Sequence, residues 1–379
     1  MTTLSDFAHS TKTVVGALLL GLLTACSSQP NAQQPESSGP DPALLGVRQV
    51  WSAQVGAVNF PMTLAVNGKT VFVGDDAGNL SARDAASGAA LWQTAVGAPI
   101  SAGVGSGGRL TSVVTRGNDL VTFEVGREIW RMRMPAQVLT PPLVAGARVF
   151  VLAGDRSVTA FDGRTGRKLW SDQHPGDALV LRQAGVLSAV NNTLVVGLAG
   201  RLVGLDANSG QTLWSATIAS PRGTNDVERM VDLVSSLGRS GSVVCARAFQ
   251  AAVGCVDAAQ GRALWRQSAI GATGLQSDGD KVFGVEGDGK VMAWKMSDGQ
   301  LAWTSDALRY RQLSAPLVLG RSVVVGDETG QLHFLSRADG TVLKRLATDG
   351  SALAATPVVV GNTLVAVTRR GGMFGFQPE

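Results

Sequence analysis

The sequence is poor in the side chains from which acid–base and metal sites are usually built. Its 379 residues include one tyrosine, three cysteines and three histidines. His9 lies in a segment that we expect to be removed, which leaves His174 and His333. Two histidines are too few for a histidine-rich site, and no histidine lies near a cysteine in sequence. We therefore expect no catalytic residue and no metal.

Charge is also scarce and evenly spread. Charged residues make up 16% of the chain, the net charge is +4, and no run of five or six basic residues occurs. A nucleic-acid partner is therefore not expected. The most apolar stretch, Val14–Leu23, is too short to span a bilayer comfortably.

The first 45 residues resemble the leader and tether of a bacterial lipoprotein. Lys12 precedes the apolar run, and Leu23-Thr-Ala-Cys26 resembles a lipobox, in which the cysteine receives lipid. This predicts a signal peptide over residues 1–25 and lipidation of Cys26; the alternative is an ordinary secretory signal with a chance cysteine. Ser27 in place of aspartate implies the outer membrane, with a lipid anchor on the periplasmic face. Residues 26–45, rich in Ser, Gln and Pro, predict a flexible tether, followed by one domain over 46–379.

One sequence unit recurs along that domain. Its clearest copy is Asp-Gly-Arg-Thr-Gly-Arg-Lys-Leu-Trp, residues 162–170, and similar copies end at Trp92, Trp214 and Trp265. Weaker copies and an isolated Val-Trp pair end at Trp130, Trp303, Lys344 and Trp51. The eight end-points are 41, 38, 40, 44, 51, 38 and 41 residues apart, and a period near forty is typical of a propeller or solenoid.

The segments between the copies predict an all-β, eight-bladed β-propeller. Three short runs rich in β-branched residues precede each unit, a fourth follows its glycine, and no helical periodicity is present. Eight three-strand groups begin near Met62, Pro99, Pro142, Val186, Val231, Gly271, Pro316 and Pro357. Arg48–Gln54 supplies an eighth outer strand only if it pairs into the last blade, so we expect the two chain ends to close the ring. Seven blades are the alternative.

The repeated unit itself is interpreted as scaffold. Its aspartate can accept backbone N–H groups two or three residues on, and its glycine allows positive φ. The tryptophan then packs between adjacent blades with its indole N–H directed at a carbonyl group.

Two copies carry a family resemblance. The patterns Ala82-x-Asp84-x-x-Ser-Gly88-x-x-x-Trp92 and Ala160-x-Asp162-x-x-Thr-Gly166-x-x-x-Trp170 resemble the tryptophan-docking motif of quinoprotein-type propellers. That family includes quinone-dependent dehydrogenases and the non-enzymatic lipoprotein subunits of the outer-membrane β-barrel assembly machine. The lipobox, the one-propeller length and the seventh blade resemble the second group. This implies a scaffold without cofactor that binds BamA and, through it, the assembly complex, and that assists unfolded outer-membrane β-barrel precursors. The alternatives are a quinoprotein-like dehydrogenase and an envelope polysaccharide-binding propeller.

Two segments stretch the repeat, and the resemblance assigns both to the BamA contact. In Gly176-Asp-Ala-Leu-Val-Leu-Arg-Gln it implies Leu179, Leu181 and Arg182; the alternative is an ordinary inner strand. In the longest gap, 51 residues, it implies Glu228, Arg229 and Asp232; the alternative is a long solvated connection. The family has a further aspartate where this chain has Val234.

Two of the three cysteines lie in neighbouring runs. Cys245 and Cys255 flank a turn near Gln250 and could face each other across a hairpin. A disulfide is consistent with an oxidising periplasm, and two free buried thiols are the alternative.

Overall fold

The described part of the chain is built from strands and turns alone. The computed structural model describes residues 35, 39–175, 180–221, 224 and 230–379, and these residues contain no helix. Consequently no described segment is a helix long and apolar enough to cross a membrane. Ser37–Glu379 form one compact unit, and the following description is of that unit.

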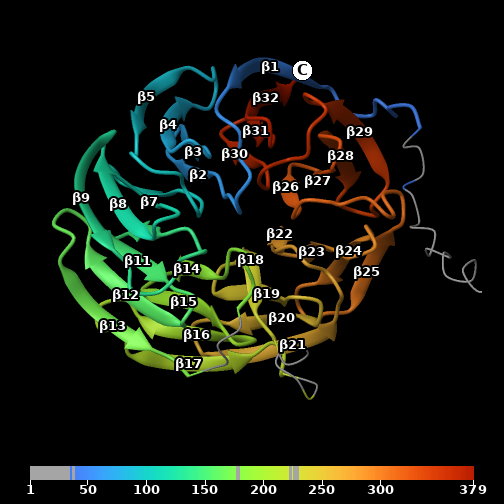
Figure 1. The fold of residues 1–379 in the computed structure, drawn as a ribbon. Helices are drawn as coiled ribbons and strands as arrows, with labels where there is room; N and C mark the ends of the chain where they lie inside the picture. The colour runs from blue at the N-terminus through green and yellow to red at the C-terminus, as the bar shows by residue number, and fades with distance from the viewer. Residues whose placement is uncertain (1–34, 36–38, 176–179, 222–223, 225–229) are drawn as a thin grey trace, which may run out of the picture. The chain divides into compact units, whose positions relative to one another are not determined.

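The described strands form eight antiparallel four-stranded sheets, which are arranged as the blades of a ring (Figure 1). The eight-bladed β-propeller is therefore confirmed, and the seven-bladed alternative is wrong. The blades, each from inner to outer strand, are blade 1, β2 (Ala65–Asn67), β3 (Thr70–Gly74), β4 (Asn79–Asp84) and β5 (Ala90–Ala95); blade 2, β6 (Gly105–Gly107), β7 (Leu110–Val114), β8 (Asp119–Glu124) and β9 (Arg127–Arg133); blade 3, β10 (Leu143–Ala145), β11 (Arg148–Leu152), β12 (Ser157–Asp162) and β13 (Lys168–Gln173); and blade 4, β14 (Leu187–Val190), β15 (Thr193–Leu198), β16 (Arg201–Asp206) and β17 (Thr212–Thr217).

The second half of the ring repeats this order until the last blade, whose outer strand comes from the start of the chain. Its blades are blade 5, β18 (Leu233–Ser240), β19 (Val243–Ala248), β20 (Ala252–Asp257) and β21 (Arg262–Ser268); blade 6, β22 (Gln276–Ser277), β23 (Lys281–Val285), β24 (Val291–Lys295) and β25 (Leu301–Ser305); blade 7, β26 (Leu317–Leu319), β27 (Ser322–Gly326), β28 (Gln331–Ser336) and β29 (Val342–Ala347); and blade 8, β30 (Val358–Val360), β31 (Thr363–Val367), β32 (Gly372–Pro378) and β1 (Val47–Gln54).

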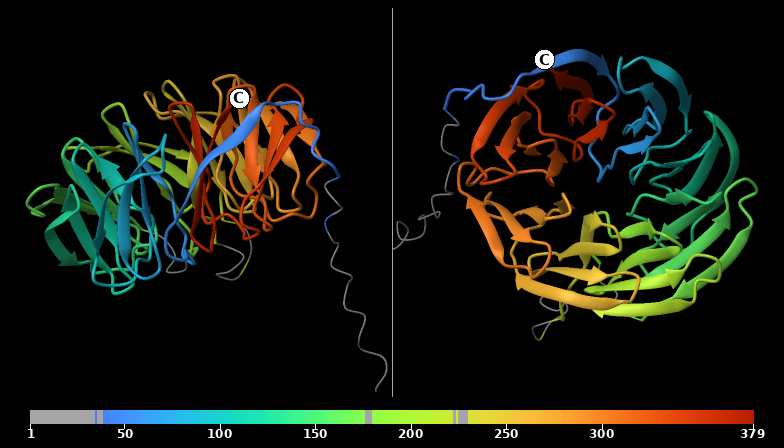
Figure 2. Two further views of the ribbon diagram at one scale, coloured as in Figure 1. Left: turned by 90° about the horizontal axis from the view of Figure 1, so that it is seen from above. Right: turned by 180° about the vertical axis from the view of Figure 1, so that it is seen from behind.

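The ring closes where the two chain ends pair. Strand β1 runs antiparallel to β32, from Val47 opposite Pro378 to Gln54 opposite Gly372, as the sequence predicts. Figure 2 shows β1 lying along the outside of the last blade in both views. The apolar cores lie between neighbouring blades, since each cluster draws side chains from two or three of them. The closed ring leaves no blade without a neighbour on either side.

The tryptophans of the repeat fasten each blade to the next. Five indole N–H groups donate to a backbone carbonyl in the following blade, at 2.7–3.1 Å, from Trp51, Trp130, Trp170, Trp265 and Trp303. The turn glycines allow this approach: a Cβ on Gly88 would lie 2.5 Å from the ring of Trp51, and its φ is +72°. The unit is scaffold, as expected.

Blade 7 departs from this scheme because blade 8 has no docking turn. The outer strand of blade 8 comes from the N-terminus, so no turn joins it to β32. Lys344 takes the tryptophan's place, and its Nζ lies 2.9 Å from the carboxylate of Asp41. Asp41 also accepts the backbone N–H of Arg345 at 2.9 Å, and Leu44 donates its N–H to Leu343. Residues 40–45, which we expected within the tether, therefore contact β29.

Candidate partner-binding face

The two faces of the ring differ in the kind of connection they carry. Because each blade is antiparallel, the loop that leads into its inner strand lies at the same end as the turn between its second and third strands. We call this end the leading-loop face. The opposite end carries the tryptophan-docking turns and the first-to-second-strand turns, and we call it the docking-turn face. The two segments that stretch the repeat both belong to leading loops.

In four of the eight blades, 1, 6, 7 and 8, a polar side chain at the start of the second turn holds the leading loop. Asp75 accepts the N–H of Gly56 in blade 1, at 3.2 Å. Glu286 accepts the N–H of Ile270 in blade 6. In blade 8 Thr368 donates its hydroxyl to Asp349 at 2.7 Å. These bonds replace the water that a surface loop would otherwise bind and so fix its path.

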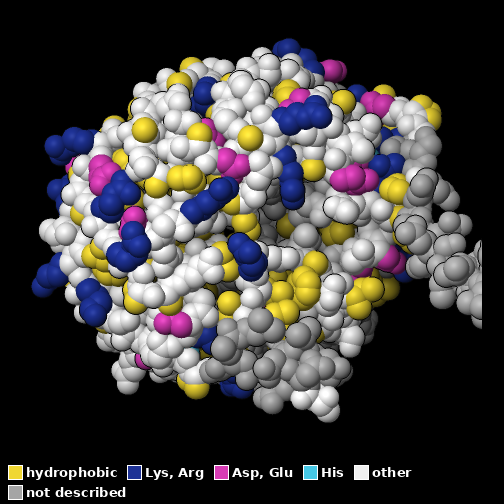
Figure 3. Space-filling model, in the orientation of Figure 1, with side chains coloured by type: hydrophobic (Ala, Val, Ile, Leu, Met, Phe, Trp, Pro, Cys, Tyr) yellow, Lys and Arg dark blue, Asp and Glu magenta, His cyan; other side chains and the backbone are white. Residues whose placement is uncertain are grey.

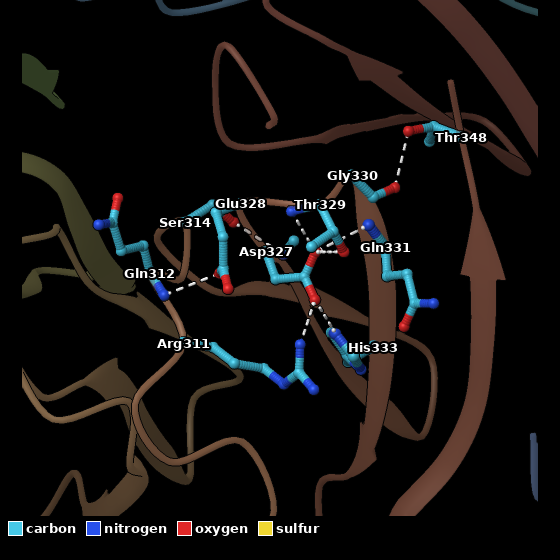
Figure 4. Close-up of polar contacts among 11 residues, drawn as sticks. Arg311, Gln312, Ser314, Asp327, Glu328, Thr329, Gly330, Gln331, His333 and Thr348 are labelled. Carbon is cyan, nitrogen blue, oxygen red and sulfur yellow. Dashed lines mark hydrogen bonds and ion pairs between the residues drawn. The ribbon is translucent and has the colours of Figure 1, made fainter. Parts of the chain in front are cut away.

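Blade 7 shows this arrangement in a fully buried form (Figure 4). The carboxylate of Asp327 lies 3.1 Å from the guanidinium of Arg311 in the leading loop and 2.9 Å from Nε2 of His333. Burial alone would raise the pKa of Asp327, but hydrogen bonds from His333, Thr329 and the N–H of Gln331 outweigh it and lower the pKa to about 2. Asp327 is therefore ionised in the folded protein, and its charge is matched by Arg311.

Blades 3, 4 and 5 lack a polar residue at this position. They carry Ala153, Leu198 and Ala248, all of them buried. At this position the leading loops of blades 4 and 5 therefore lack the side-chain bond to their own second turns, although the N–H of Phe249 still donates to the carbonyl of Asp232 in blade 5. These are the two loops in which the spacing of the repeat rises to 44 and 51 residues.

The leading loops of blades 4 and 5 are instead held by each other. The backbone N–H of Leu181 donates to Oδ2 of Asp232 at 2.9 Å, and Arg156, 7% exposed, lies 3.9 Å from the other oxygen of that carboxylate. Four residues beyond Leu181, Gly185 pairs with Val234 in the inner strand of blade 5 through an isolated bridge. Two segments that are some fifty residues apart in sequence thus meet at one place.

A small, mostly apolar cavity of about 60 Å³ lies beneath this contact. Leu181 lines it and is half-buried, whereas Arg182 is exposed. A wider hollow of about 620 Å³ opens at the ring centre, and Gln183 and Ser235 are among the residues that line it. Figure 3 shows hydrophobic side chains gathered beside this hollow. Lysine and arginine side chains are dispersed over the blades in the same view.

The structure describes half of the predicted contact residues. Leu181, Arg182 and Asp232 lie within the described ranges and are brought together on the leading-loop face. Leu179, Glu228, Arg229 and the predicted lipidation site Cys26 lie outside them. Val234, where the resemblance expects an aspartate, is 2% exposed and pairs with Arg247 in blade 5, so its side chain is not part of the surface.

Two residues of this site were not predicted. Arg156 lies in the second turn of blade 3. Thr140 lies in the loop that leads into the same blade, and its hydroxyl accepts the N–H of Gly185 at 2.9 Å. Neither lies near the predicted segments in sequence. A comparison of the second-turn position across the repeats would have exposed the change from Asp, Glu or Thr to Ala and Leu, and hence the unusual loops.

Cys245 and Cys255 lie in blade 5, whose leading loop belongs to this site. Cys245 on β19 is directly opposite Cys255 on β20, with Cα atoms 4.0 Å apart, and the structure joins them as a disulfide. Both side chains are fully buried. Within the described ranges, no three His, Cys, Asp or Glu side chains are close enough together to hold a metal ion.

Comparison with known proteins gives one family. The pattern of the family described as outer membrane protein assembly factor BamB matches residues 46–102, 76–305 and 257–379. A BamB of Burkholderia pseudomallei is 36% identical over 363 residues, covering 94% of this chain and 95% of its own. A BamB of Bordetella pertussis is 32% identical over 366 residues, covering 95% and 94%.

Solved structures agree on the fold. The crystal structure of BamB from Moraxella catarrhalis superposes with a TM-score of 0.79 at 23% identity, covering 87% of this chain and 99% of that one. A quinohemoprotein alcohol dehydrogenase from Comamonas testosteroni has the same fold, with a TM-score of 0.69 at 13% identity, covering 88% and 77%. At these identities the likeness shows the propeller alone.

Proposed function

This chain belongs to the family of outer membrane protein assembly factors named BamB, and on that premise we propose that it is a non-enzymatic lipoprotein scaffold of the outer-membrane β-barrel assembly complex. It binds BamA through the leading loops of blades 4 and 5 and so assists the folding and insertion of β-barrel precursors. Lipid on Cys26 anchors it to the periplasmic face of the outer membrane.

The observation that carries this proposal is the contact between Leu181 and Asp232. It gives the two loops a common, fixed position instead of leaving each to solvent. Arg182 follows directly and is exposed, so a cation projects beside a half-buried leucine. An exposed arginine next to an apolar anchor is a common composition for the centre of a protein interface.

A pull-down from solubilised membranes tests the contact. We expect Arg182→Glu to lower the recovery of BamA at least tenfold, because a reversed charge opposes the partner's surface. Arg116→Glu is the matched control, since it is an exposed arginine on the same face in blade 2. Equal recovery of BamA with Arg182→Glu and wild type would refute this interface.

A second variant separates the loop contact from the surface charge. Asp232→Ala removes the acceptor for Leu181 and the partner of Arg156, which should release both loops. We expect reduced BamA recovery together with new proteolytic cleavage in the leading loops, while unfolding of the propeller still occurs in one cooperative step. Intact loops with undiminished BamA recovery would show that this bond does not organise the site.

The non-enzymatic part of the proposal rests on the residues present. The family resemblance implies adjacent cysteines in the quinone-dependent dehydrogenases, and no two cysteines are adjacent in this sequence. Purified protein should show no quinone absorbance and no dye-linked alcohol oxidation with added pyrroloquinoline quinone and calcium. Either signal would favour the dehydrogenase alternative.

A further inference from the structure

The docking-turn face carries a basic hollow that the proposed function does not use. In blade 2 the turn between the third and fourth strands is two residues long, Val125 and Gly126, whereas the corresponding turn of blade 3 has five, Gly163–Arg167. A cavity of about 350 Å³ lies between the two blades, lined mainly by the first-to-second-strand turn of each blade. Arg109 and Arg164 stand on its opposite sides.

The two arginines share one carboxylate. Oε1 of Glu124 lies 3.1 Å from Arg109 and 3.6 Å from Arg164, while the two arginine side chains remain 70% and 71% exposed. One negative charge thus holds two cations beside each other and leaves a net positive charge at the mouth of the cavity. The guanidinium groups keep N–H donors directed to solvent, since each has five.

The surrounding turns add more positive charge. Arg127, Arg167 and Lys168 are exposed on the same turns of blades 2 and 3. Two other acidic residues lie there. Asp162 accepts the N–H and hydroxyl of Thr165 within its own turn, both at 2.9 Å, so its charge is directed into the turn. Glu128, next to Arg127, is paired with Arg131 at 2.8 Å. Five exposed cations therefore face three acidic groups that are already engaged.

Exposed apolar side chains are also more numerous on this face than on the other. Six of the seven large hydrophobic side chains that are exposed in the described ranges lie at the docking-turn ends of their strands or beside a turn there. They are Leu44, Val66, Leu91, Val125, Leu213 and Leu301. Only Ile270 lies on the leading-loop face. These six are spread around the ring and do not form one contiguous patch.

We propose that the docking-turn face of blades 2 and 3 rests on an anionic phospholipid surface. On these two blades the five cations lie near one exposed aliphatic side chain, Val125. This composition fits lipid headgroups, where the cations meet phosphates and the aliphatic group enters the interface. A contiguous apolar patch, which often marks a site for another folded protein, is not formed by these side chains. The proposal depends on the predicted anchor for proximity: twelve residues separate Cys26 from Gly39, a reach of at most roughly 40 Å.

Vesicle sedimentation tests this with the unlipidated propeller, residues 39–379, which lie within the one compact unit. We expect it to pellet with vesicles in which about a third of the lipid is phosphatidylglycerol and not with pure phosphatidylcholine. Binding should vanish at about 1 M salt, where charges are screened beyond about 3 Å. Because lipidation and BamA are both absent, the result is independent of the proposed BamA contact.

Charge reversal on each face in turn shows whether binding depends on the docking-turn face of blades 2 and 3 or only on the net charge of the protein. The double variant Arg164→Glu, Arg167→Glu should weaken vesicle binding at least tenfold, since each cation near an anionic surface contributes about fivefold. The matched control is Arg369→Glu, Arg370→Glu, two exposed adjacent arginines on the leading-loop face. We expect the control to retain binding within about threefold.

A third variant tests the apolar contribution. Val125 has φ +48°, so Val125→Asn suits the backbone while removing an exposed aliphatic group, and it should reduce binding about two- to fivefold. Failure of the wild-type propeller to bind anionic vesicles would overturn the proposal. So would equal weakening by both double variants, or binding to isolated peptidoglycan in place of vesicles.

Discussion

Lys344 shows how single residues follow the topology of the ring. The outer strands of the other seven blades carry tryptophan at this position, and each tryptophan packs on the turn of the next blade. Blade 8 has no such turn, so a tryptophan here would lack its glycine and its carbonyl group. A lysine paired with Asp41 suits the segment that covers the strand instead. The repeat therefore predicted the positions of the docking tryptophans. The lysine in place of an eighth tryptophan could be explained only once the pairing of β1 with β32 was known.

Removal of a docking tryptophan should destabilise the propeller. Trp303 is 9% exposed, donates to the carbonyl of Arg337 at 3.0 Å and lies against Gly340. We expect Trp303→Ala to lower the free energy of unfolding by about 3–5 kcal/mol in urea titrations. Leu301→Ala, on the same strand but 54% exposed, is the control and should change it by less than about 0.5 kcal/mol. Similar losses in the two variants would contradict the docking role.

Asp327 should make part of the stability dependent on acid pH. Its pKa is lowered from 3.8 to about 2, so its contribution is fully present above about pH 4 and is lost as the pH falls to about 2. That contribution is about 2 kcal/mol. Asp327→Asn should cost roughly 3 kcal/mol at neutral pH, because the buried ion pair with Arg311 loses its negative charge.

The pH dependence distinguishes this charge from a packing effect. The gap in unfolding free energy between wild type and Asp327→Asn should shrink by about 2 kcal/mol between about pH 5 and about pH 2. Glu328→Gln, one residue further, keeps an acceptor for Gln312 and should show no such change. A constant gap across that range would mean that the carboxylate's charge contributes nothing.

At the scale of elements, the leading loops carry most of what distinguishes this propeller from its own repeat. Their unusual length was readable from the spacing, and the resemblance supplied Leu181, Arg182 and Asp232. The way the loops meet was not readable. The bond from Leu181 to Asp232 depends on the loop of blade 4 crossing onto blade 5, and Arg156 joins from a turn of blade 3. Such contacts between distant segments leave no periodic signal in one sequence.

The β19–β20 hairpin offers a test of the proposed disulfide. Mass spectrometry of protein purified without reductant should find the peptides of Cys245 and Cys255 linked. Replacing both cysteines with alanine should lower the free energy of unfolding by at most about 2–3 kcal/mol, because the closed loop is short and its strands are already paired. Free thiols in protein purified in this way would favour the alternative of two buried cysteines.

At the scale of the whole molecule, the count of strands was enough to predict the ring. Seven complete outer strands and an unpaired one at the front admit one economical closure, and the pairing of β1 with β32 is that closure. Register within the pairing was not predictable, since a bulge between Gln49 and Trp51 shifts it. The bulge lies beside Trp51, the residue of β1 that docks on blade 1.

Because the ring closes in this way, we expect the stability of the propeller to depend on the N-terminal strand β1. A chain that begins at residue 56 would leave the edge of β32 unpaired and the slot of Trp51 on Gly88 empty. We expect it to lose roughly 5 kcal/mol or more of unfolding free energy and to aggregate, whereas a chain that begins at residue 39 should match the full-length protein. A synthetic peptide of residues 39–55, added in excess, should restore the monomeric state and the urea midpoint of the shortened chain. A shortened chain that stays monomeric and unfolds at the wild-type midpoint without the peptide would show that the ring does not depend on this strand.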